Sequence, residues 1–177
     1  MKSTIFMWES IGAIMIFLIG AIIHFGYEIT DNFTPLSGIF AVNESIWEHC
    51  KLTFWAPLIF AVIEYFFIGD YANNFLVAKI ASAFVTTIAM VILYYGWLNL
   101  FHKHSFIADL IIFEISILIG LFISYNLMLM EPLPDLLTTV SIFALICATF
   151  LFYFFTYYPP HLPIFHCSAT GKYGLNN

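Results

Sequence analysis

The sequence predicts an all-α fold, a polytopic membrane bundle of about five transmembrane helices followed by an ordered C-terminal tail. The first reason is composition, because 62% of the 177 residues are hydrophobic and only 9% are charged. A soluble domain is about half apolar and about a quarter charged. The second reason is that five apolar stretches each reach the length of ~20 residues that a ~30 Å hydrocarbon layer requires.

The five predicted spans cover residues 5–29, 46–68, 75–101, 106–130 and 136–158. Breaks that contain Gly, Pro, Asn or Asp, or the His102-Lys103-His104 run, separate them. Because most connections are short, consecutive helices should be antiparallel neighbours. We therefore predict a transmembrane domain over residues 1–158 and an extended tail over residues 159–177 that docks on the bundle.

Two segments outside the spans are too apolar for ordinary solvated loops. The first connection, residues 30–42, carries several large apolar side chains, so it should pack over the mouth of the bundle. Pro159-Pro160-His161-Leu162-Pro163-Ile164-Phe165 is typical of an extended, polyproline-like segment with apolar surface to dock. Between them, Asn43 is expected to cap the second helix and to place Glu44 in its first turn.

Charge and cysteine usage exclude several function classes. The net charge is −6, and all five basic residues are lysines, which argues against nucleic-acid binding. The three cysteines show no Cys-x-x-Cys spacing, so a thioredoxin-like or iron–sulfur site has no support. The expected surroundings are a lipid bilayer, in the cytoplasmic membrane of a bacterial cell.

Span counting places most of the chemistry at one membrane face. We define face A as the side of the N-terminus and face B as the opposite side. All six histidines then fall on face B: His24, His49, His102, His104, His161 and His166. Near face A, the residues Glu9, Glu64 and Lys79 have similar depths, which predicts either a structural ion pair or a proton or ion path.

The candidate site lies where the first helix ends and the second begins. His24, Glu28, Glu48 and His49 are the candidate ligands of a divalent metal such as Zn²⁺ or Fe²⁺. Without a metal, the set Glu44, Glu48, His49 and Lys51 could perform acid–base chemistry on a lipid head group or a small polar substrate. The structural alternative is a network in which Lys51 neutralises Glu48 and His49 hydrogen-bonds a carbonyl.

Three stretches of the sequence are distinctive motifs. The most specific is Val42-Asn43-Glu44-Ser45-Ile46-Trp47-Glu48-His49, and the others are His24-Phe25-Gly26-Tyr27-Glu28 and Thr170-Gly171-Lys172-Tyr173-Gly174. Together they resemble an uncharacterised family of small bacterial multi-pass membrane proteins common in Firmicutes. The family usually has Pro at the position of Ala41 and Asp-Pro at Cys167-Ser168, so we expect the tail turn to differ here. The resemblance covers essentially the whole chain and implies no activity.

Three functions stay open from the sequence. They are a membrane enzyme or metal-binding protein with its site on face B, a small transporter, and a structural or accessory protein whose buried charges set helix packing. A transport path would need polar groups at mid-membrane. The middles of the first, third and fifth spans are almost wholly apolar, which counts against transport.

Overall fold

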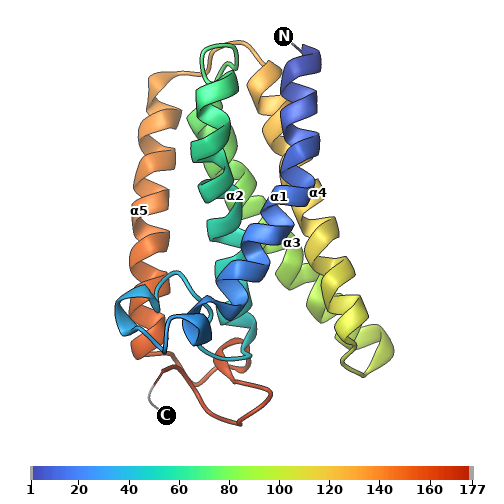
Figure 1. Cartoon of the computed structure of the whole chain (residues 1–177), viewed down its shortest axis with the longest axis vertical. Coiled ribbons are helices and arrows are strands. Elements are labelled where there is room, and N and C mark those ends of the chain that lie inside the picture. Colours follow the sequence, from blue (N-terminus) through green and yellow to red (C-terminus); the bar gives the residue numbers. More distant parts are fainter. Residues whose placement is uncertain (1, 176–177) are drawn as a thin grey trace.

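The computed structural model describes residues 2–175 and shows five long helices in that part of the chain (Figure 1). Their bounds are α1 Lys2–Ile29, α2 Ile46–Ile68, α3 Phe75–Phe101, α4 Phe106–Leu129 and α5 Asp135–Tyr157, with short 3₁₀ turns η1 Thr34–Leu36 and η2 Pro163–Phe165. All five are long and apolar enough to cross a membrane. The predicted all-α membrane bundle is confirmed, and residues 176–177 of the predicted tail lie outside the described part.

The helices divide into an inner pair and an outer set. The spans α2 and α3 bury about half of their residues, whereas α5 buries few. The main packing pairs are α3 with α4, α1 with α2, and α2 with α3. Large apolar side chains on the outer surface, such as Phe66, Phe122 and Phe150, are exposed and would contact lipid. This explains why the helices are apolar on every side rather than on one stripe.

Small residues let α3 and α4 approach closely. A Cβ atom added at Gly120 would collide with Thr86 Oγ1 and would lie 3.0 Å from the Ser82 carbonyl oxygen. Membrane helices gain little from apolar burial against each other, so close backbone approach and the dispersion contacts it permits become important. Gly120 therefore determines the spacing of the helix pair that makes up one wall of the candidate site.

The first connection and the tail both lie at face B, at the lower end of the bundle in Figure 1. Tyr153 and Tyr157 of α5 donate hydrogen bonds to carbonyls of the connection, at Pro35 (2.5 Å) and Thr34 (3.0 Å). In the tail, the backbone N–H of Leu175 donates to the Thr156 carbonyl at 3.0 Å. These bonds satisfy non-helical backbone at the membrane edge and attach α5 to both the first connection and the tail.

Candidate metal centre

The local structure before α2 differs from the predicted cap. Ser45, not Asn43, is the N-cap, and its hydroxyl accepts a hydrogen bond from the Glu48 N–H at 3.3 Å. The Asn43 side chain instead accepts from the Ser45 N–H (2.8 Å) and donates to the Gly174 carbonyl in the tail (3.1 Å). An Asn–Ser pair offers two possible caps; here the Asn43 oxygen accepts from Ser45, and the Ser45 hydroxyl caps the helix.

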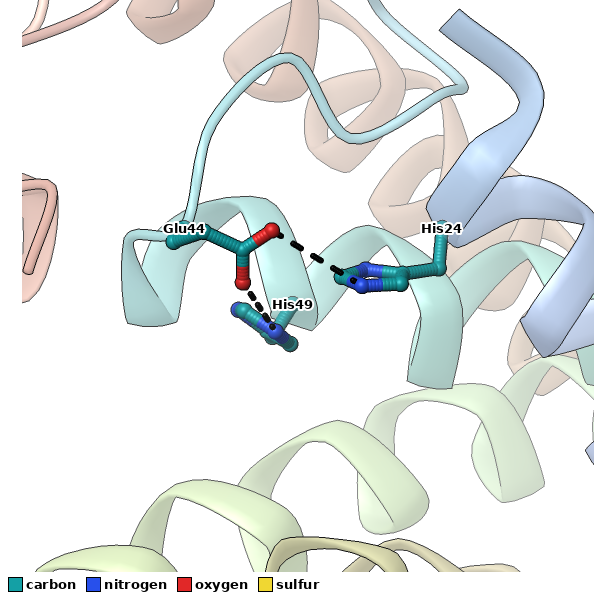
Figure 2. A group of neighbouring side chains, drawn as sticks. All are labelled: His24, Glu44 and His49. Carbon is teal, nitrogen blue, oxygen red and sulfur yellow. Dashed lines mark ion pairs between the residues drawn. The ribbon is translucent and has the colours of Figure 1, made fainter. Parts of the chain in front are cut away.

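This shift of the cap changes where Glu44 points. The sequence predicted Glu44 in the first turn of the second helix, but Glu44 precedes that helix and does not share a helical stripe with Glu48 and Lys51. Its carboxylate instead lies between two imidazoles, with His24 on α1 and His49 on the first turn of α2 (Figure 2). Half of the Glu44 side chain is exposed, compared with 23% of His24 and 36% of His49. The group is thus open at the membrane surface.

The three side chains converge on one point. Glu44 Oε1 lies 3.7 Å from His24 Nε2, and Glu44 Oε2 lies 3.5 Å from His49 Nε2. One ligand atom from each residue lies within 4.8 Å of the other two. These separations are longer than good hydrogen bonds, so the three side chains face one another without being hydrogen-bonded to one another.

The second nitrogen of His49 determines which tautomer faces Glu44. His49 Nδ1 lies 2.8 Å from the Ser45 carbonyl oxygen, which can only accept, so Nδ1 carries the proton. In the neutral ring Nε2 then presents a lone pair toward Glu44. Metal-binding histidines are typically held in this way, by a carbonyl on the other ring nitrogen. The structural alternative drawn from the sequence also expected His49 to hydrogen-bond a carbonyl. The same hydrogen bond would orient His49 for metal binding.

A cavity of about 260 Å³ adjoins the three residues. Its polar lining includes Tyr94, His104, Asp109 and Ser168, and apolar side chains of α1 and α4 make up much of the remaining wall. The Tyr94 hydroxyl lies 3.0 Å from His104 Nδ1. Asp109 Oδ1 is buried and has no hydrogen-bond partner among the described residues. A carboxylate in this state is available to hold a proton or to bind a polar group in the cavity.

Glu48 and Lys51 lie in a different environment. Both are buried, and Lys51 Nζ lies 2.5 Å from Glu48 Oε2. Lys51 also donates to the Ser37 carbonyl and to Thr156 Oγ1, each at 2.7 Å. Glu48 Oε2 accepts the Val42 N–H at 2.9 Å. The pair thus joins α2, the first connection and α5, as the structural alternative expected of Lys51 and Glu48.

The structure therefore separates the predicted site residues into two groups and leaves Glu28 outside both. His24, Glu44 and His49 meet beside the cavity. Glu48 and Lys51 form the buried pair, and the cavity lining does not include them. Glu28 is exposed on the last turn of α1 and is not part of the three-residue group.

The cavity also contains residues that the sequence did not assign to this site. Span counting placed His104 on face B, but no helical spacing related it to His24 and His49. Asp109 lies in the face B half of the fourth span, from which the sequence allowed it to extend the polar cluster inward, and it also lines the cavity. Nothing in the sequence distinguished Tyr94 from the other tyrosines, of which the chain has ten in all. Ser168 belongs to the tail, and its hydroxyl donates to the Glu44 carbonyl at 3.3 Å. Only the folded tail brings Ser168 to the site.

The pKa of the Cys167 thiol, next to Ser168 in the tail, is shifted from its ordinary value. Burial raises the pKa of the Cys167 thiol, but hydrogen bonds from Thr170 and from backbone groups of Thr170, Glu44 and Ala169 outweigh burial and lower it below its ordinary value. Hydrogen bonds to a thiolate favour the ionised form. The side chain is almost completely buried, which limits access of reagents.

Five apolar helices of spanning length, joined by short connections, define a multi-pass membrane protein. The chain belongs to the family of unknown function DUF6512, whose profile matches residues 1–175. The predicted membership of an uncharacterised family covering nearly the whole chain is confirmed to that extent. No match was found among curated proteins or among solved structures.

Proposed function

We propose that this protein is a metal-dependent membrane enzyme that binds one zinc ion through His24, Glu44 and His49. The observation that supports this most strongly is the convergence of three ligand atoms within 4.8 Å without hydrogen bonds between them. Two imidazoles and a carboxylate are a ligand set found in catalytic zinc sites, which leave a fourth position for water.

The ligand types favour zinc. Two imidazole nitrogens and one carboxylate oxygen are donors that zinc accepts in a four-coordinate site with an open position for water. The three donor atoms lie within 4.8 Å of one another, so small side-chain movements would bring them onto one ion. Iron, the other metal that the sequence allowed, usually takes more ligands in an open octahedral site.

Zinc would supply Lewis acidity and a water molecule that ionises near neutral pH. Asp109 would accept the proton of that water, because its carboxylate lines the same cavity and its Oδ1 has no hydrogen-bond partner in the described part of the chain. The apolar wall of the cavity, which includes Phe17, Phe113 and Leu110, suits an acyl chain or another apolar group. We therefore infer hydrolysis of an amphipathic substrate, such as a lipid whose head group lies beside the ion.

We also propose a location in a bacterial cytoplasmic membrane with face B in the cytoplasm. Lys51 and Lys79 are buried in ion pairs, so they do not count as flanking charges. Lys103 and Lys172 then remain at face B, and Lys2 at face A. The positive-inside rule favours the face with more lysines near the span ends.

Metal analysis tests the ligand set directly. Protein purified in detergent under metal-replete conditions should contain about one zinc per chain. Glu44→Gln and His49→Ala should each weaken zinc binding at least about tenfold, while Glu28→Gln, a matched change of an exposed carboxylate nearby, should leave the zinc content unchanged. Wild-type protein without metal, or equal loss in all three variants, would refute the proposal and favour a structural role.

A further inference from the structure

A second group of ionisable side chains lies near face A, at the other end of the bundle from the candidate metal centre. Glu9 of α1, Glu64 of α2 and Lys79 of α3 meet there, with Ser124 of α4 beside them. In Figure 1 the end of the bundle that carries the N-terminus is the upper end. All four residues are buried, and the exposed fraction is 5% or less for each.

One ammonium serves two carboxylates in this group. Lys79 Nζ lies 2.7 Å from Glu9 Oε1 and 2.5 Å from Glu64 Oε2. The Ser124 hydroxyl donates a further hydrogen bond to Glu9 Oε1 at 2.7 Å. The group thus includes the structural ion pairs that buried membrane charges usually form, but their charges do not balance.

The remaining oxygens show where the imbalance lies. Glu9 Oε2 and Glu64 Oε1 are buried and have no hydrogen-bond partner among the described residues. With both carboxyls ionised, the group would carry one uncompensated negative charge inside a membrane. An unpaired buried charge is strongly disfavoured and normally disappears by protonation. The site therefore requires either a proton or a small cation.

A proton satisfies the geometry better than a metal cation does. The ammonium of Lys79 already occupies the position between the two carboxylates, and it would repel a second cation there. Hard cations also need six or more oxygen ligands. A proton needs only one of the free carboxylate oxygens, and two close carboxyls commonly share one proton.

We propose that Glu9, Glu64 and Lys79 form a proton-binding site that holds one proton on the carboxyl pair at neutral pH. The group is then neutral overall, with one carboxylic acid, one carboxylate and one ammonium. Among the contacts of these side chains, α4 contributes only the hydroxyl of Ser124, so no further charge faces the pair from that helix. The site is separate from the proposed metal centre and does not depend on it.

Infrared spectroscopy of purified protein tests this proposal. At neutral pH the wild type should show the carbonyl band of a protonated carboxyl group that is shielded from water. Glu64→Gln and Glu9→Gln should each remove most of that band, because the neutral amide leaves one carboxyl opposite Lys79, and that carboxyl can then ionise as the partner of the ammonium. Glu131→Gln, a matched change of an exposed carboxyl, should leave the band unchanged.

A second measurement covers the case in which a Gln variant does not fold. Unfolding the wild type in unbuffered detergent at neutral pH should release about one proton, because the solvated carboxyls of the unfolded chain ionise. Absence of both the band and the proton release would overturn the proposal. A band that neither folded Gln variant reduces, or a stabilisation by sodium ions that Glu64→Gln abolishes, would overturn it as well.

Discussion

Substituting each member of the buried pair, Glu48 and Lys51, tests whether Glu48 binds metal or stabilises the fold. Glu48→Gln keeps the shape of the side chain but removes its charge, and Lys51→Met removes the ammonium. Lys51 is completely buried and Glu48 is 1% exposed. Neither can turn to water when its partner is lost, so the remaining charge must be accommodated inside the protein.

The contacts of each residue set the expected magnitudes. Removing one member of a buried ion pair costs about 3–5 kcal/mol. In Glu48→Gln, Lys51 keeps the carbonyls of Ser37 and Phe40 and the hydroxyl of Thr156 as acceptors. We therefore expect a loss of about 3 kcal/mol in the free energy of unfolding. In Lys51→Met, the Glu48 carboxylate keeps the hydrogen bond from the Val42 N–H and its place in the first turn of α2. We therefore expect a loss of about 5 kcal/mol in the free energy of unfolding.

The double variant isolates the interaction between the two charges. Combining Glu48→Gln with Lys51→Met leaves no buried charge, so its cost should be smaller than the sum of the single costs by at least about 2 kcal/mol. The assay is unfolding in mixed micelles with increasing SDS, followed by circular dichroism. Glu28→Gln, at an exposed position, serves as the control and should lie within about 0.5 kcal/mol of the wild type.

Zinc content measured on the folded fraction completes the experiment. If Glu48 has only a structural role, folded Glu48→Gln protein should keep its zinc. Additive single costs, or single costs below about 0.5 kcal/mol, would refute the role of the ion pair. A stable Glu48→Gln variant that lost its zinc would instead establish Glu48 as a ligand, as the sequence alone suggested.

Three further predictions concern packing and the tail. Gly120→Ala should destabilise the α3–α4 pair by about 1–3 kcal/mol, because its Cβ would collide with α3; Gly96→Ala, which meets nothing within 4 Å, should not, as SDS unfolding would report. Phe165→Ala should cost about 3 kcal/mol, since this ring is buried against aromatic side chains of α2 and α5, and an unchanged unfolding midpoint would contradict a docked tail. Cys167 should be alkylated with a midpoint at lower pH than an ordinary thiol, because its pKa is lowered. Thr170→Val should raise that midpoint, as mass spectrometry of the Cys167 peptide would report, and an unmoved midpoint would exclude Thr170 as the cause.

The sequence by itself was sufficient for the membrane class and for the helices. Spanning the hydrocarbon layer requires long apolar runs, and such runs are visible without knowledge of any contact. Helices α2 and α3 have the bounds predicted for their spans, while α1 begins at Lys2 rather than at Ile5. Span counting also placed the histidines on one face, because the side of each residue depends only on how many spans precede it.

Only the tertiary structure decided which of the face B residues act together. The sequence placed Glu44 in the first turn of the second helix, but that helix begins at Ile46 with Ser45 as its cap, so Glu44 turns to the imidazoles and Glu48 to Lys51. The segment before this cap also contacts the tail, because Asn43 donates to the carbonyl of Gly174, which lies far away in the chain. Likewise, the cavity combines four helices and the tail, and local sequence patterns do not record how neighbouring helices rotate against one another. Long-range packing therefore decided the composition of the site. Each ionisable side chain of face B had several possible partners nearby in the sequence, and the packing of the helices and the tail determined which of them it contacts.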